Sequence, residues 1–276
     1  MSLALFRTTL RLSQWAIIGW AVFLVLYGVL ILLLFPSFQE SYSDVIGLYT
    51  KSMPKGVLEA LGLTENVIND LLSKEGPAVH GYLAMEYLNW WTLVAGIYAF
   101  MFGSGTVARE ADRGTMEFLL SQPVPRYLVV VSKFAAFLAI TAIFVVFTVA
   151  GIGLGLLAIR ESADLWRLFL TTLQGGLAVV SIAAYSTLIS CIFLDPRKAM
   201  AIAGGLTAGM YILSLLGPIL GPFDWLQKLS LFYHFKPFDI LVHGTFSMSS
   251  LLVFLTVTAV CLGAALVVFQ RRKAVV

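Results

Sequence analysis

The sequence predicts an all-α integral membrane protein with six transmembrane helices, and two observations carry this prediction. Of the 276 residues, 59% are hydrophobic and only 12% are charged, whereas soluble domains carry about 25% charged residues. Long runs also contain no Asp, Glu, Lys or Arg, and each exceeds the ~20 residues with which a helix crosses a bilayer core. These runs are Leu12–Gln39, Tyr87–Ala108, Phe134–Ile159, Leu168–Leu194, Ala199–Phe223 and Ile240–Gln270.

The basic residues predict the orientation. An even number of spans places both termini on one side, and that side collects 11 of the 18 basic residues but only 4 of the 15 acidic ones. Because Lys and Arg beside span ends favour the cytoplasm, we expect both termini to be cytoplasmic. The basic residues on this side are Arg7, Arg11, Arg109, Arg113, Arg126, Lys133, Arg197, Lys198, Arg271, Arg272 and Lys273.

The first span covers about residues 14–35, and Pro36 marks its exit. No small-residue cleavage site closes it, so we expect an anchor and not a cleaved signal peptide. Residues 1–14 before it form either an interfacial helix on the inner leaflet or a helical lead-in to the span. Residues 36–85 follow as a water-facing segment, which we expect to fold with helices as a lid on the outer mouth.

The second span covers about residues 87–107, and its helix is expected to continue to Arg113. His80 and Glu86 lie just before it, where such a pair belongs either to proton chemistry or, more commonly, to a solvated loop. The third span covers about residues 128–158. Its glycines at alternate positions predict a flexible or unwound outer end; they are Gly151, Gly153 and Gly155.

The fourth and fifth spans cover about residues 168–194 and 199–220, with a tight inner turn at Asp195–Lys198. The fifth span carries small residues at four-residue spacing, which permits close helix packing, either within one subunit or against a second one. These small residues are Ala201, Gly205 and Gly209.

The segment before the last span, at about residues 247–270, is rich in Trp, Phe, Tyr and His and is broken by Pro222, Pro237 and Gly244. Amphipathic aromatic side chains concentrate at the membrane–water boundary. We therefore expect an outer, re-entrant-like segment that dips into the leaflet and returns.

The densest charge in the chain lies between the second and third spans, in AREADRGTMEFLLSQPVPRYLVVVSK. We expect the preceding helix to stop at Gly114, because glycine readily adopts a left-handed cap conformation. Thr115 then caps a short helix with Glu117 in its first turn, and two prolines end it. The result is a rigid knob suited to a protein socket, with apolar side chains from Met116, Phe118, Leu119 and Leu120.

This loop resembles the cytoplasmic loop of type-2 ATP-binding-cassette (ABC) transporter permeases. In that family a glutamate, a Gly-Thr pair, a second glutamate, two leucines, a proline and an arginine recur in this order and form the coupling helix that docks on the ATPase subunit. The matching positions are Glu110, Gly114, Thr115, Glu117, Leu119, Leu120, Pro123 and Arg126. Arg113 and Phe118 complete the expected ATPase-coupling interface, within a coupling loop at 108–127. The alternative is an ordinary loop whose charges only keep it in water.

The segment before the last span is also similar to the corresponding outer element of this family. A leucine, a serine and a phenylalanine precede an aspartate and a glycine, although Leu231 stands where the family usually has proline. The matching positions are Leu229, Ser230, Phe232, Asp239 and Gly244.

The resemblance covers most of the chain, read as a single transmembrane domain over residues 1–276. It implies the permease subunit of an ATP-driven transporter in a prokaryotic-type cell membrane, exporting a hydrophobic or amphipathic substrate such as a drug, peptide or lipid-like molecule. The implied partners are two copies of a separate ATPase, which bind ATP and Mg, a second identical or related permease chain, and membrane lipids. A membrane-embedded scaffold or enzyme component with the same topology is the alternative.

Several chemistries are not expected of this chain. It has no G-x-x-x-x-G-K-[ST] loop, so we expect neither ATP binding nor enzymatic activity in it. Cys191 and Cys261 fall inside predicted spans, so we expect no structural disulfide or metal site, and nothing points to nucleic acid. The predicted spans carry almost no ionisable residue at their centres, which disfavours a transporter driven by protons or sodium.

Overall fold

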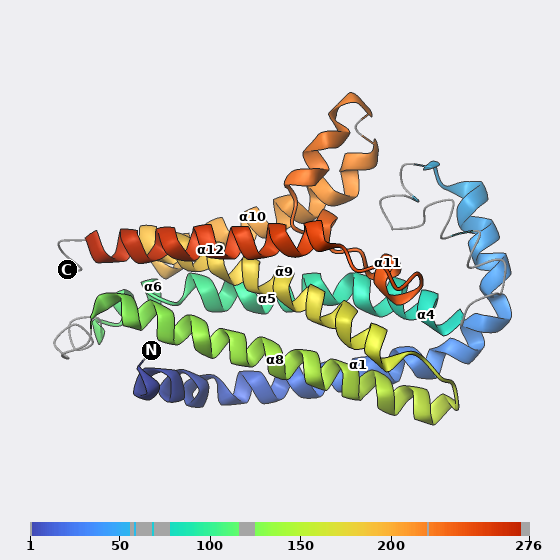
Figure 1. Cartoon of the computed structure of the whole chain (residues 1–276), viewed down its shortest axis with the longest axis horizontal. Coiled ribbons are helices and arrows are strands. Elements are labelled where there is room, and N and C mark those ends of the chain that lie inside the picture. Colours follow the sequence, from blue (N-terminus) through green and yellow to red (C-terminus); the bar gives the residue numbers. More distant parts are fainter. Residues whose placement is uncertain are drawn as a thin grey trace.

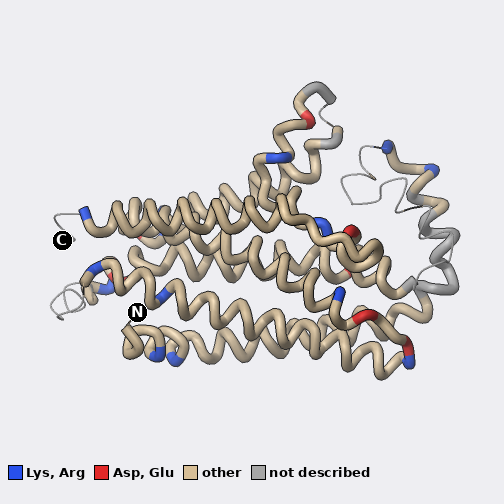
Figure 2. The backbone as a smooth tube through the Cα atoms, in the orientation of Figure 1, with Lys and Arg blue, Asp and Glu red and all other residues tan. Residues whose placement is uncertain are grey.

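The computed structural model is an all-α bundle, described over residues 2–55, 58, 68, 78–115, 125–219 and 221–271. Its long helices lie lengthwise beside one another (Figure 1). The start of α1 (Leu3–Ser52) and the end of α12 (Met248–Arg271) lie at the same end of the bundle, which we name the terminal end; the opposite one is the far end. Lys and Arg predominate over Asp and Glu at the terminal end (Figure 2).

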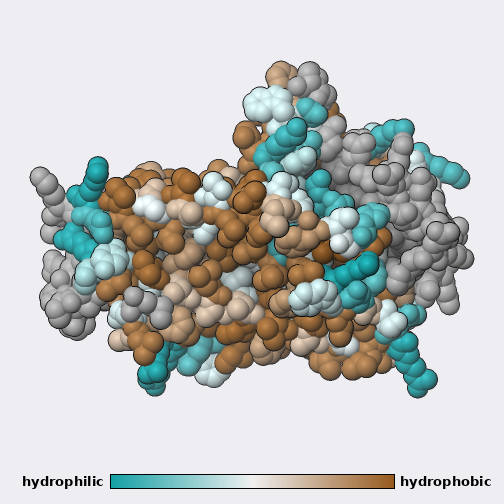
Figure 3. Space-filling view, viewed as in Figure 1, coloured by the Kyte–Doolittle hydropathy of each residue, from teal (hydrophilic) through white to brown (hydrophobic). Residues whose placement is uncertain are grey.

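Five helices in the described part of the chain are long and apolar enough to cross a membrane. Their outward side chains form a broad hydrophobic surface along the bundle (Figure 3). This confirms the all-α membrane class, whereas the count of six spans stays a prediction. The five are the Leu3–Ser37 part of α1, α8 (Arg126–Ile159), α9 (Leu165–Ile192), α10 (Pro196–Leu216) and α12.

Two short helical elements lead into the predicted second span, at about residues 87–107. A short α4 (Ala78–Tyr82) leads into the π-helical η1 (Leu83–Leu88), which leads into α5 (Asn89–Ser104). The junction residues keep right-handed helical dihedrals, so the helix axis continues. Tyrosine hydroxyls tie this pass to α1: Tyr82 donates to the Ile31 carbonyl at 2.9 Å and Tyr87 to that of Leu24 at 3.0 Å.

The expected continuation of the second helix to Arg113 is interrupted. A turn at Gly105–Val107 separates α5 from α6 (Ala108–Asp112). The Ser190 hydroxyl of α9 accepts hydrogen bonds there from the backbone N–H groups of Val107 and Ala108, at 3.0 and 2.9 Å. These bonds satisfy the donors that the break exposes and fix the start of α6 to α9.

The expected unwinding of the third span was wrong. α8 stays helical to Ile159, because Gly151 and Gly155 lie on one face against α1. A Cβ at Gly151 would meet the Val25 Cα at 2.7 Å, and one at Gly155 would meet the Leu32 Cδ1 at 2.7 Å. Glycine permits this close approach of two helices. Gly153 faces open space.

α1 also differs from the prediction. It begins at Leu3 and runs without interruption into the span, which favours the lead-in alternative over a separate interfacial helix. It also continues beyond Pro36 to Ser52, through the first part of the predicted 36–85 segment, and its last part bends across the far end of the bundle (Figure 1). A proline inside a helix kinks it. Residues 56–57, 59–67 and 69–77 of the predicted lid lie outside the described residues.

α9 is the central helix: most of its side chains are buried, and it packs against α5, α8, α10 and α12. Aspartates begin α9 and α10. Asp164 Oδ1 accepts from the backbone N–H groups of Trp166 and Arg167. Asp195 does the same at the start of α10, where Pro196 takes the first helical position. The connection between the two helices is short, as predicted, but it lies at 193–195, and residues 196–198 of the predicted turn already belong to α10.

The aromatic segment before α12 leaves the bundle and returns. η2 (Gly217–Ile219) and η3 (Gly221–Leu229) project sideways beyond α10, and η4 (Phe232–His234) and α11 (Pro237–Leu241) come back toward α4 (Figure 1). The returning Phe235 ring packs so closely on α9 that a Cβ at Gly175 would lie 3.2 Å from it. The described segment thus runs out and back, whereas its dip into the outer leaflet stays a prediction.

Candidate functional site

The predicted motif residues that the structure describes meet at the terminal end. Gly114 has φ +66°, the left-handed conformation predicted for it, and it ends the helical turn after α6. The Thr115 hydroxyl donates to the Glu110 carboxylate and lies 3.2 Å from the Glu110 carbonyl oxygen. Arg113 precedes Gly114, and Arg126 begins α8. The other motif residues lie outside the described ranges; they are Glu117, Phe118, Leu119, Leu120 and Pro123.

An ion pair connects α6 to α8. Lys133 Nζ donates to Glu110 Oε1 at 2.7 Å and to the Thr106 carbonyl at 2.8 Å. The two side chains are only 12% and 23% exposed. Burial alone raises the pKa of Glu110, but the hydrogen bond and charge of Lys133, with Thr115 and Arg113, lower the pKa overall. The carboxylate is therefore ionised at neutral pH, and α6 is held to α8 by a charge-assisted bond.

A cavity of about 500 Å³, the terminal-end pocket, opens beside this ion pair. Hydroxyl groups and cationic side chains line one part of it, and apolar side chains line the rest. Arg109 folds over Gly105, where an added Cβ would lie 2.7 Å from its Nη2. The lining residues are Leu5, Thr8, Thr9, Leu12, Ser13, Phe102, Gly105, Thr106, Arg109, Glu110, Arg113, Thr115 and Lys133.

Sequence reasoning missed this pocket, although one signal was present. The lining positions of α1, from Leu5 to Ser13, follow helical spacing on a single face. Nothing in the sequence showed that this face meets the ends of α5 and α8.

Comparison with known protein families adds the observation that decides the class: the model of the ABC-2 family transporter proteins matches residues 6–274. The chain belongs to the ABC-2 transporter permease family. This match runs from α1 to the end of α12, and it confirms the resemblance found in the loop around Gly114. The permease is therefore the membrane subunit of an ABC transporter and not its ATPase. No curated protein matches it.

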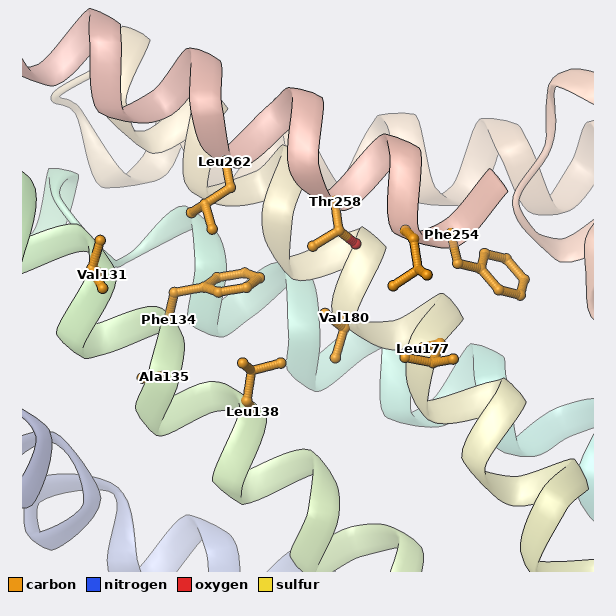
Figure 4. Close-up of a pocket in the computed structure, with 10 residues that line it drawn as sticks. Val131, Phe134, Ala135, Leu138, Leu177, Val180, Phe254, Thr258 and Leu262 are labelled. Atoms are coloured by element: carbon orange, nitrogen blue, oxygen red, sulfur yellow. The ribbon is translucent and has the colours of Figure 1, made fainter. Parts of the chain in front are cut away.

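The permease has a second cavity, of about 400 Å³, between α8, α9 and α12 (Figure 4). Phe134 and Leu138 of α8 point toward Thr258 of α12 across it, and Thr258 is the polar residue among those that line it. Its hydroxyl lies 3.1 Å from that of Ser181, which donates to the Phe254 carbonyl at 2.9 Å. The walls of this apolar pocket offer contacts to a hydrocarbon group and no charge.

At the far end of the permease, His80 joins α4 to the start of α9. Its Nε2 accepts the backbone N–H of Asp164 at 3.0 Å. Burial, and then the positive charge of Arg167, lower the pKa of His80, while Asp164 opposes them. Arg167 Nε lies 3.3 Å from Asp164 Oδ2, and its Nη1 donates to the Val242 carbonyl at 3.0 Å.

The solvated-loop interpretation of His80 and Glu86 was wrong. His80 is 6% exposed, and Glu86 is half-buried in η1, where its carbonyl accepts from the Tyr27 hydroxyl at 3.0 Å. In the ranges that the structure covers, no group of three or more His, Cys, Asp or Glu could hold a metal ion.

Proposed function

We propose that the permease exports a hydrophobic or amphipathic substrate and that a separate cassette ATPase drives it through the terminal end. The observation that carries this proposal is the pair of ties on the segment before Gly114. Lys133 bonds this segment to α8, and Ser190 bonds it to α9. A force applied to the Gly114 loop therefore reaches two long helices directly, which is what mechanical coupling requires.

The terminal end then faces the cytoplasm, as its basic residues favour. ATP and Mg belong to the ATPase, and the helix at 114–121 is the element that docks on it. The apolar pocket supports the substrate class, because an uncharged cavity of about 400 Å³ suits a hydrocarbon or aromatic group.

The proposal includes a second permease chain, and α10 supports it. Ala201, Gly205 and Gly209 are exposed, and apart from neighbouring residues of α10 itself no described atom lies within 4 Å of where a Cβ at Gly205 or Gly209 would stand. Packing within the subunit thus leaves this surface unused. Small residues four positions apart permit another helix to approach closely, so we place the seam between two copies here.

Coupling is tested with Gly114→Val, Glu117→Ala and Phe118→Ala in the reconstituted complex. Valine fits poorly at the positive φ of Gly114, and truncating an interface anchor costs roughly 2 kcal/mol or more. We expect all three variants to insert in the membrane but to lose ATPase co-purification or substrate-stimulated ATP hydrolysis by about tenfold or more. Gly153→Val is the matched control, since Gly153 faces open space. Normal ATPase binding and transport by all three variants would show that the loop is only a solvated connector and not the coupling element.

Assembly is tested by native mass spectrometry of the complex, in which we expect two permease and two ATPase subunits. Gly205→Leu/Gly209→Leu should release permease monomers without lowering their melting temperature, because neither glycine packs within the chain. Gly153→Leu should leave the stoichiometry unchanged. A dimeric double variant would exclude α10 as the seam, and a native complex with one permease chain would exclude the dimer.

A further inference from the structure

The terminal-end pocket carries more positive than negative charge. Three cationic side chains line it, those of Arg109, Arg113 and Lys133, against the single carboxylate of Glu110. Lys133 occupies that carboxylate at 2.7 Å. Over the described residues, no carboxylate lies within 4.0 Å of either guanidinium group, and Arg109 donates a long hydrogen bond of 3.5 Å to the Met101 carbonyl. Among the described residues neither guanidinium therefore forms an ion pair, although the charge of Arg113 acts on Glu110 from beyond 4.0 Å.

These donors suit a phosphate group. A guanidinium presents a planar fork of N–H donors that matches phosphate oxygens in pairs. Lys133 uses two of its three N–H donors, for Thr106 and Glu110, so the third remains for a ligand. On the α1 wall the Thr8 hydroxyl adds a further donor, whereas that of Thr9 donates to the Leu5 carbonyl at 2.7 Å. The volume of about 500 Å³ lies within the usual range for ligand pockets.

We propose that the terminal-end pocket binds the phosphate group of an anionic phospholipid from the leaflet at this end of the permease. Basic pockets between transmembrane helices on the cytoplasmic side are typical sites for anionic lipid headgroups. The proposal goes beyond coupling and transport, since it concerns a bound lipid and not the transported substrate.

The apolar part of the pocket favours a lipid over a soluble phosphate compound. Leu5, Leu12 and Phe102 line it, and Leu12 is 79% exposed. α1 exposes further apolar side chains beyond the pocket, with Trp15 77% and Ile18 51% exposed. A headgroup in the pocket would therefore leave its acyl chains beside a continuous hydrophobic and aromatic surface, which a soluble phosphate cannot use.

The test is native mass spectrometry of the detergent-purified full chain with added phosphatidylglycerol, and with phosphatidylcholine of the same acyl chains. We expect phosphatidylglycerol to bind at least tenfold more tightly than phosphatidylcholine. Arg109→Gln/Arg113→Gln should weaken phosphatidylglycerol binding at least tenfold, and Arg109→Lys/Arg113→Lys should retain part of it. Arg197→Gln, which removes an exposed charge outside the pocket at the same end, should have no effect.

Glycerol 3-phosphate separates the two sources of the phosphate group. We expect millimolar glycerol 3-phosphate not to displace phosphatidylglycerol. Its displacement of the lipid, or its binding with equal affinity, would overturn the lipid assignment in favour of a soluble ligand. Equal binding of phosphatidylglycerol by the natural chain and the Gln double variant, with unchanged melting temperatures, would overturn the pocket altogether.

Discussion

At the terminal end, Lys133 and Glu110 form an ion pair whose side chains are 12% and 23% exposed, whereas the far-end pair of Arg167 and Asp164 is 40% and 44% exposed. Solvent and salt screen an exposed pair, which typically contributes 0–1 kcal/mol. A mostly buried pair depends on both partners, because removing one leaves an uncompensated charge. Breaking the terminal-end pair should therefore lower the stability of the fold more than breaking the far-end pair. A strong connection at this end suits the coupling role that we propose for it.

The far end depends instead on hydrogen bonds to backbone groups and on apolar packing. His80 accepts from the backbone of Asp164, and Arg167 reaches the Val242 carbonyl at the end of α11. Phe235 and Phe238 are buried beside them. A buried ion pair therefore holds the helices together at the end that we assign to the ATPase, and apolar packing holds them together at the other end. The two ends should respond differently to mutation and to pH.

The largest expected effect is that of Lys133→Met. This change leaves the Glu110 carboxylate with Thr115 but without its cation, and breaking a buried pair costs roughly 3–5 kcal/mol. Because Glu110 keeps some exposure, we expect a loss of about 2–3 kcal/mol in the free energy of unfolding, measured as a lower melting temperature in detergent.

The matched control for this change is Lys198→Met. Lys198 lies 3.8 Å from Asp195, with side chains 72% and 45% exposed, so its loss should cost less than about 1 kcal/mol. Lys133→Met/Glu110→Gln should recover part of the lost stability, since no charge is then left buried. Equal effects of the two lysine changes would remove the distinction between the buried and exposed pairs.

Local signals in the sequence predicted much of this architecture. Uncharged runs predicted the long helices, Asp195 and Pro196 predicted a turn, and Gly114 predicted a left-handed break. The ordered loop string also identified the family, because the spacing of its residues is specific even where each residue alone is not. The coupling helix itself stays a prediction.

Contacts between distant segments could not be predicted in this way. From the sequence, Gly151 and Gly155 predicted an unwound helix end. In the structure they pack against Val25 and Leu32 of α1, a contact that the sequence did not indicate. The pair of Lys133 and Glu110 joins positions 23 apart across a loop, and the terminal-end pocket needs α1, α5 and α8 to converge. The spacing of residue types along a helix shows which side chains share a face, but it does not show which other segment packs against that face.

The smallest expected effect is a pH dependence confined to the far end. The pKa of His80 lies below 6.5 in the folded protein, so its contribution to stability is fully present above pH 6.5 and is lost as the pH falls toward the lowered value. The pKa of Glu110 lies below 4.5, so the terminal-end pair stays ionised over this window.

His80→Gln keeps an acceptor for the Asp164 N–H but does not titrate. Melting temperatures from pH 7.5 to 5 should therefore fall further for the natural chain than for His80→Gln, by a difference corresponding to no more than about 1 kcal/mol. If the melting temperatures of the two proteins change in parallel with pH, protonation of His80 does not destabilise the far end. The predicted contrast in pH response between the two ends would then be absent.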